Sequence, residues 1–381
     1  MRLHCIVVPL FVLGSSCATT DGTPTAPADA NVIGDGVSTD TAPLADAPKS
    51  DGGDTGVAAD TLGGDSGGRV TGIVIGTNGT ALRTSDGGSS WTAGTTGTTA
   101  TLERLDARPG AAIVRACGDG VILRSVDRGG TWTTERADGT HWLSIRYVDE
   151  LHGWVVGRNA SGTAALARTS NGGATYEDVA SPVEGAHFYS QISFPDAKHG
   201  FLAGEAADGS SLVLHSDDGG ATWSPQSIPT RTDGLNDLFF VSATTGWAVS
   251  GGGNSAVVNG AVLSTVDGGV TWTTTRVDDP LGGFLGIFAT DAKTVWVTGV
   301  HDDGVGTLTG SAFVSTDGGG SYVSRPIGGG AALEAVYFSS PTRGFICGDR
   351  GVIQATTDGG AKWSTLPSGA TADLHDILMD L

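Results

Sequence analysis

The stretch Ser125-Val126-Asp127-Arg128-Gly129-Gly130-Thr131-Trp132 decides the fold, because its pattern occurs seven times along the chain. Each copy has Ser or Thr first, Asp third (Asn once), Gly fifth and an aromatic residue eighth. The copies run over residues 84–91, 125–132, 169–176, 216–223, 265–272, 315–322 and 356–363.

Each residue type in this repeat suits a tight turn between two strands. The Asp carboxylate can accept hydrogen bonds from nearby backbone N–H groups, and the Gly pair can take the positive φ that hairpin turns require. The aromatic ring opens the returning strand and can pack against a neighbouring unit. Seven copies are too many for one active site, so we interpret the repeat as structural, not as a metal or catalytic site. The residues concerned are Asp86, Asp127, Asn171, Asp218, Asp267, Asp317 and Asp358, with Trp91, Trp132, Trp223, Trp272 and Trp363.

The third residues of successive copies are 41 to 50 positions apart, a period typical of propellers and solenoids. Each unit reads as four strands, which is one propeller blade. The first unit has a strand at Val70 to Gly76 but lacks the strand before it, whereas the chain ends in an unmatched strand at Leu374 to Leu381. We therefore predict an all-β, seven-bladed propeller of four-stranded blades. The C-terminal strand would complete the first blade and remove an exposed sheet edge.

A second signature precedes several repeats: glycine, an aromatic residue, apolar residues and a small residue, at 153–157, 200–204, 246–250 and 344–348. Together the two patterns resemble the Asp-box, or BNR, repeats of propellers of the photosystem II assembly and stability factor-like type. The resemblance covers about residues 69–381 and implies a seven-bladed ring. It implies little about activity, because Asp-box propellers serve sialidases, other glycosidases, sorting receptors and assembly factors.

The N-terminal segment is expected to direct export. Arg2 is followed by a short apolar run, Ile6 to Leu13, and then by Gly14-Ser15-Ser16-Cys17. The run is too short to span a bilayer. Residues 1–17 resemble a bacterial lipoprotein signal with Cys17 as the lipid anchor, and an ordinary secretory signal cleaved nearby is the alternative. Ala18 resembles the outer-membrane sorting pattern, which implies a lipoprotein facing the periplasm or the cell surface.

Residues 18–68 contain nine Asp, one Lys and no aromatic residue, a composition that predicts a disordered acidic tether before the propeller at 69–381. The net charge of −20 argues against nucleic acid and anionic membranes as partners. Membrane contact is therefore expected only through the N-terminal lipid. Cys117 and Cys347 end equivalent strands, and we expect two buried thiols, with a disulfide as the alternative.

No zinc, nucleophile-elbow or phosphate-loop pattern occurs, so we assign no metal, cofactor or catalytic residue. A sialidase would carry Arg-Ile-Pro near its start, whereas this chain has Arg325-Pro326-Ile327 late in the sequence. Another glycosidase would need two carboxylates about 5 to 10 Å apart in one cleft. Loop acids that could supply them are Glu184, Glu205, Asp208, Asp302 and Asp303, which nothing in the sequence pairs.

The connections between the second and third strands are long only in units three to six. Binding usually resides in such loops on a rigid scaffold, although neutral drift of loop length is the alternative. The candidate binding residues are Arg158, Asn159, Glu205, Asp208, His301, Asp302 and Asp303. We expect an exported, lipid-anchored, monomeric, non-catalytic scaffold that binds an envelope protein or a glycan. A glycoside hydrolase or a carbohydrate-binding protein is the alternative.

We predict that Cys17 carries the lipid, because it directly follows the apolar run and the small residues of the signal. Metabolic labelling with a fatty-acid probe should label the wild-type chain and leave Cys17→Ser unlabelled. Equal labelling of the two chains would contradict the prediction.

Overall fold

The computed structural model describes residues 71–108, 113–228, 234–251, 260–277, 282–302, 308–328 and 332–381. All of them belong to one unit, Gly64–Leu381. The predicted signal at 1–17, with Cys17, and the predicted tether at 18–68 lie outside the described residues. Among the described residues no helix is long and apolar enough to cross a membrane.

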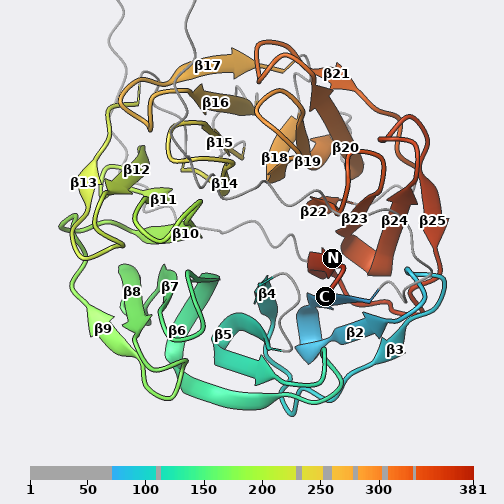
Figure 1. Ribbon diagram of the computed structural model, residues 1–381, viewed down its shortest axis with the longest axis horizontal. Coiled ribbons are helices and arrows are strands. Elements are labelled where there is room, and N and C mark those ends of the chain that lie inside the picture. Colours follow the sequence, from blue (N-terminus) through green and yellow to red (C-terminus); the bar gives the residue numbers. More distant parts are fainter. Residues whose placement is uncertain are drawn as a thin grey trace, which may run out of the picture. The chain divides into compact units, whose positions relative to one another are not determined.

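The described chain folds into six antiparallel sheets that surround a common centre (Figure 1). One sheet joins the two ends of the ring: β26 (Leu374–Met379), β1 (Gly72–Gly76), β2 (Ala81–Thr84) and β3 (Thr92–Ala93). A six-stranded sheet runs β4 (Leu102–Ala107), β5 (Val114–Ser125), β6 (Thr133–Tyr147), β7 (Gly153–Arg158), β8 (Ala164–Thr169) and β9 (Glu177–Val179).

The other four sheets have four strands each. They are β10 (Phe188–Ser193), β11 (Gly200–Glu205), β12 (Ser211–Ser216) and β13 (Ser224–Pro225); β14 (Asp237–Phe240), β15 (Gly246–Val249), β16 (Ala261–Thr265) and β17 (Thr273–Arg276); β18 (Gly282–Ala289), β19 (Val295–Asp302), β20 (Leu308–Ser315) and β21 (Val323–Ser324); and β22 (Leu333–Phe338), β23 (Gly344–Gly348), β24 (Val352–Thr356) and β25 (Ser364–Leu366). Two 3-10 turns, η1 (Thr77–Gly79) and η2 (Asp349–Gly351), connect β1 to β2 and β23 to β24.

The all-β propeller is confirmed, but the predicted number of seven four-stranded blades is wrong. The structure has six blades, because the second and third repeats share the six-stranded sheet. Strand β6 runs without a break from Thr133 to Tyr147 and pairs first with β5 and then with β7. His141 lies at the junction, opposite Asp119 on β5 and Arg158 on β7. The segment between the two repeats, where a loop was expected, is therefore part of strand β6.

The predicted closure of the ring is confirmed. The C-terminal strand β26 pairs antiparallel with β1, in a register that places Gly72 opposite Met379 and Val74 opposite Ile377. Ile377 and Met379 are buried with Val74 in one apolar cluster. The last strand of the chain thus covers the inner edge of the first sheet.

The seven repeats form the turns that connect the two outermost strands of each repeat, and Asp127 shows the bonding. Its carboxylate accepts the Thr131 N–H at 2.8 Å and the hydroxyls of Ser125 and Thr131, each at 2.8 Å. The Ser125 hydroxyl in turn accepts the Gly129 N–H at 2.8 Å. The Thr131 N–H and the other bonds lower the pKa of Asp127 to about 2. These local bonds agree with the structural role inferred from the sequence.

The turns also pack on the preceding repeat. The Trp154 ring of β7 donates from Nε1 to the Gly219 carbonyl at 3.2 Å, across to the turn between β12 and β13. A Cβ on Gly220 would lie 2.6 Å from the Trp154 ring, and Gly220 has a φ of +89°, so the position requires glycine. Trp247 of β15 makes the same bond to the Gly318 carbonyl, at 2.9 Å. Each such contact joins neighbouring parts of the ring.

Both cysteines of the ring are buried and free, as predicted.

Candidate functional site

Charged residues gather where the inner strands of the ring begin. Strand β4 starts Leu102-Glu103-Arg104, β26 starts Leu374-His375-Asp376, and β22 starts Leu333-Glu334. In all three the pairing with the next strand slips by one residue at this point. Such bulges bend a strand and re-aim its side chains. We call the following set the axial cluster: Glu103, Arg104, His141, Asp237, Glu334, His375 and Asp376.

Glu103 links three inner strands by binding two histidines. One carboxylate oxygen lies 3.0 Å from His375 Nδ1 on β26, and the other lies 3.1 Å from His141 Nε2 on β6. His141 Nδ1 also lies 3.2 Å from the Asp119 carboxylate. The side chains of Glu103 and His375 are largely buried, which strengthens these charged contacts.

Glu103 favours the charged forms of both histidines. Burial opposes the charge on His375, but the hydrogen bond and negative charge of Glu103 outweigh it and raise the pKa of His375 to about 9. The pKa of His141 is raised in the same way, again against its burial. Burial also opposes ionisation of Glu103, yet the two histidines lower its pKa below the usual range. At neutral pH His375 and Glu103 are therefore both ionised.

A second set of contacts crosses between inner strands that are distant in sequence. Arg104 Nη2 lies 3.4 Å from the Asp237 carboxylate of β14. Asp237 also accepts the Gln191 side-chain amide at 2.6 Å and the Ile287 N–H at 3.1 Å. Asp376 accepts the Leu105 N–H at 2.7 Å, and burial raises the pKa of Asp376 to about 6 against the opposing charge of Arg104.

Glu334 differs from the other acids of the axial cluster. In the described part of the chain its carboxylate has no hydrogen bond or ion pair, although the residue is only partly exposed. Burial raises the pKa of Glu334 to about 7, while the charge of His375 opposes the shift and that of Asp349 adds to it. An acid titrating near neutral pH and free of partners is the group in this cluster that can respond to a ligand.

Of the candidate binding residues proposed from the sequence, Arg158 borders this cluster, through its pairing with His141, and the others described next do not. Asn159 and Asp208 fold their own turns, by accepting the Thr163 and Ser210 N–H groups at 3.1 and 3.0 Å. Glu205 lies 2.7 Å from His187 Nδ1. Arg158 ends β7 opposite His141. Binding by these residues stays a prediction.

One of the long connections expected in units three to six runs over residues 300–311, and its described part is strand, since His301 and Asp302 pair with Thr309 and Leu308. Asp303 lies outside the described residues. Glu184, an acid considered for glycosidase chemistry, is in a turn between β9 and β10.

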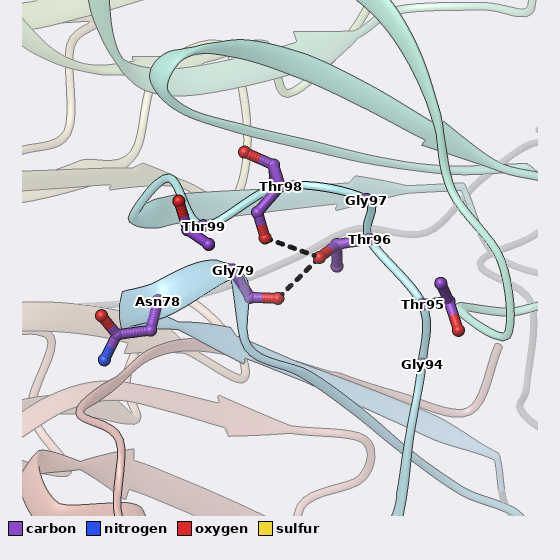
Figure 2. Close-up of a pocket in the computed structure, with 8 residues that line it drawn as sticks. All are labelled: Asn78, Gly79, Gly94, Thr95, Thr96, Gly97, Thr98 and Thr99. Atoms are coloured by element: carbon purple, nitrogen blue, oxygen red, sulfur yellow. Dashed lines mark hydrogen bonds between the residues drawn. The ribbon is translucent and has the colours of Figure 1, made fainter.

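One hollow on the described surface is wide open and has no charged residue in its lining (Figure 2). It is formed by backbone and small polar side chains of residues 78–79 and 94–99. Thr96 Oγ1 donates to the Gly79 carbonyl at 2.8 Å and also lies 3.3 Å from the Thr98 carbonyl, so its hydroxyl closes the loop onto itself. Among the described residues no three His, Cys, Asp or Glu side chains are placed to hold a metal ion.

Comparison with known proteins tests the resemblance inferred above. Residues 138–298, less than half of the chain, match the family described as Photosynthesis system II assembly factor YCF48. The Asp-box propeller resemblance is confirmed. A YCF48 structure described as bound to D1 peptide matches with a TM-score of 0.57 at 19% identity, over 76% of this chain and 90% of that one. YCF48 from Cyanidioschyzon merolae matches with a TM-score of 0.55 at 21% identity, over 76% and 91%.

An enzyme has the same fold. The GH74 xyloglucanase from Xanthomonas campestris matches with a TM-score of 0.61 at 15% identity, over 80% of this chain and 55% of that one. This chain thus spans about half of the xyloglucanase. Identities this low to YCF48 and to the xyloglucanase show a shared fold alone. A comparison with curated proteins found no significant match.

We predict that His375 makes stability depend on pH. Its pKa of about 9 in the folded chain is above the ordinary 6.5. The stabilisation from its charge is therefore complete below about pH 6.5 and is lost as the pH rises through about 9. Urea unfolding should show that His375→Gln costs on the order of 2 kcal/mol near pH 6 and much less near pH 10. Glu103, Glu334 and Asp373 are the acids that face this ring.

The matched control is His152→Gln, which removes an exposed histidine from a turn formed with Asp149. Its cost should change little over the same pH interval. A cost of His375→Gln that stays constant from pH 6 to pH 10 would contradict the assignment.

Proposed function

We propose that the protein is a non-catalytic binding scaffold whose axial cluster receives a cationic side chain from a protein partner. The observation that carries this proposal is the carboxylate of Glu334, which has no partner among the described residues and is set among acids that are already engaged. A guanidinium or ammonium group next to Glu334 would favour its ionised form and gain a charged hydrogen bond.

The commitment of the other carboxylates favours binding over hydrolysis. A glycosidase needs one acid free to donate a proton and a second free to act as base or nucleophile. In the axial cluster Glu103 is held by two histidines, Asp376 by the Leu105 N–H, and Asp237 by Arg104 and the Ile287 N–H. Glu334 has the raised pKa of a general acid but lacks a free second carboxylate among these residues.

The comparisons support a protein partner. The matching family is described as an assembly factor, and one YCF48 structure contains a bound peptide. The photosystem itself is not part of the proposal, because nothing in the sequence indicates photosynthesis. The net charge of −20 instead favours partners with basic segments. Export and lipid anchoring at the outer membrane, through Cys17, complete the proposal and place the partner in the cell envelope.

The second candidate function is a glycoside hydrolase, favoured by the shared fold with the GH74 xyloglucanase and by the raised pKa of Glu334. Hydrolysis of xyloglucan is therefore the activity that distinguishes the two candidate functions.

We predict that Glu334→Gln weakens binding of a fluorescein-labelled, arginine-containing peptide to the full-length chain by about tenfold or more, as for the loss of a charged hydrogen bond. A matched peptide with citrulline in place of arginine should bind weakly to both chains. Fluorescence anisotropy at pH 8 and pH 6 measures this, and affinity for the arginine peptide should fall as Glu334 is protonated through about pH 7.

Glu150→Gln is the control, because it removes the same charge from an exposed turn. Wild-type chain should release no reducing ends from xyloglucan. If the wild-type chain released reducing ends and Glu334→Gln did not, the result would contradict the scaffold function and support the hydrolase. Equal affinity for the arginine and citrulline peptides would show that the axial cluster is not the binding site.

A further inference from the structure

A second hollow lies at the opposite ends of the same inner strands. It has a volume of about 180 Å³ and is bordered by residues that follow or end β4, β6 and β10. On β4 the axial cluster occupies Glu103 and Arg104, whereas the hollow begins at Ala107 and Arg108. The two sites are therefore separated by the length of the strand, and the second does not depend on the function proposed for the first.

Two arginines border this hollow, although the protein as a whole is acidic. Arg108 is exposed, and the Arg146 side chain is about half exposed. Arg146 Nη1 lies 3.3 Å from Asp106, which is buried behind it and also accepts the Tyr147 N–H at 3.1 Å. A guanidinium has five N–H donors, so this contact leaves Arg146 able to bind a second carboxylate.

The remaining acid of the hollow is already engaged. Asp196 accepts the Lys198 and His199 N–H groups, each at 2.8 Å, and lies 2.8 Å from His199 Nδ1. Although burial opposes ionisation, these bonds lower the pKa of Asp196. Asp196 is therefore ionised but bonded within its own turn, which leaves Arg108 and Arg146 as the groups of the hollow that can bind an acid.

The walls of the hollow are apolar and rigid. Phe194 and Tyr147 are buried, and Val148 and Pro195 complete the lining beside them. The Tyr147 hydroxyl lies 2.7 Å from that of Tyr176, which donates to Glu135 at 2.8 Å. The Arg115 guanidinium stacks on the Tyr147 ring, 3.7 Å from its centroid. A wall fixed in this way needs little ordering when a ligand binds.

The size of the hollow restricts what enters it. Sites for drug-sized ligands and cofactors measure about 300–1,000 Å³, well above the volume found here. A single apolar side chain fits, while the arginines at the rim remain accessible to an acid beside it. A sugar chain would meet two cations and no free carboxylate among the described lining residues.

We propose that this hollow binds an acidic peptide segment in which an apolar side chain stands next to a carboxylate. The apolar side chain inserts between Phe194, Pro195 and Val148, and the carboxylate pairs with Arg108 and Arg146. The site gives the scaffold a second surface for protein partners, of opposite charge preference to the axial cluster.

The test uses a fluorescein-labelled peptide with the central sequence Glu-Phe-Asp between Gly-Ser spacers, titrated into the full-length chain by fluorescence anisotropy. One comparison peptide has Gln and Asn in place of the acids, and another has Ala in place of Phe. The structure predicts that each comparison peptide binds at least about tenfold more weakly, because each lacks one half of the contact.

Two variants locate the site. Arg108→Glu should weaken binding of the Glu-Phe-Asp peptide by about tenfold or more, since it replaces attraction with repulsion. Arg276→Glu is the matched control, because it makes the same charge change at an exposed residue of the outer strand β17. Arg146 is left intact, because removing it would leave Asp106 buried without its counter-ion.

Loss of binding in Arg108→Glu but not in Arg276→Glu, with unchanged thermal unfolding of both, supports the site. Equal loss of affinity in the two variants would show that only the net charge of the protein matters, and it would overturn the proposal. So would equal affinity for the acidic peptide and its amide counterpart. Binding that weakens in Glu334→Gln but not in Arg108→Glu would assign the peptide to the axial cluster instead.

Discussion

Hydrogen bonds that backbone N–H groups of one inner strand donate to carboxylates of the preceding inner strand hold the centre of the ring. The edge of an inner strand that faces the centre has no further strand to pair with its N–H groups, and an unpaired buried N–H costs about 1–3 kcal/mol. Asp376 accepts the Leu105 N–H, Asp106 accepts the Tyr147 N–H, and Asp237 accepts the Ile287 N–H. In each case a carboxylate satisfies the backbone of the following inner strand.

The contact between β18 and β22 depends on the absence of a side chain instead of on a carboxylate. A Cβ on Gly286 would lie 2.6 Å from the Glu334 carbonyl and 2.9 Å from the Thr298 hydroxyl, so the absence of a side chain lets the two strands approach. The acids and the glycine therefore solve one problem, that of closing a ring of sheets around a narrow centre. The burial that this requires is also the cause of the raised pKa of Asp376 and Glu334, from which the proposed ligand response follows.

The peripheral architecture was predictable because its determinants are local. A box such as 125–132 contains within eight residues the acid, the hydroxyl and the glycines that form its turn. The C-terminal strand was predictable by counting, since one repeat lacked a strand and one strand lacked a repeat. The number of blades was not, because the continuity of β6 through His141 depends on pairing with β5 and β7 that no local pattern shows.

The axial cluster was missed for a related reason. Its members come from strands far apart in sequence, whereas the sequence pattern drew attention to loops, in which Asn159 and Asp208 bond within their own turns. A signal was present: a Leu followed directly by charged residues at 102–104, 333–334 and 374–376, at the start of the inner strands. A separate local pattern, Asp three residues before His, occurs in two turns outside the axial cluster. In these turns Asp149 and Asp196 accept the histidine N–H.

The central claim is that inner-strand carboxylates protect the backbone of neighbouring inner strands. Amide hydrogen exchange of Leu105 in wild type and in Asp376→Ala tests it most directly, with Asp358→Ala as a control that alters an exposed carboxylate in a peripheral turn. The account predicts that Leu105 exchanges markedly faster in Asp376→Ala and is unchanged in Asp358→Ala. Equal protection of the Leu105 amide in wild type and in Asp376→Ala would contradict it.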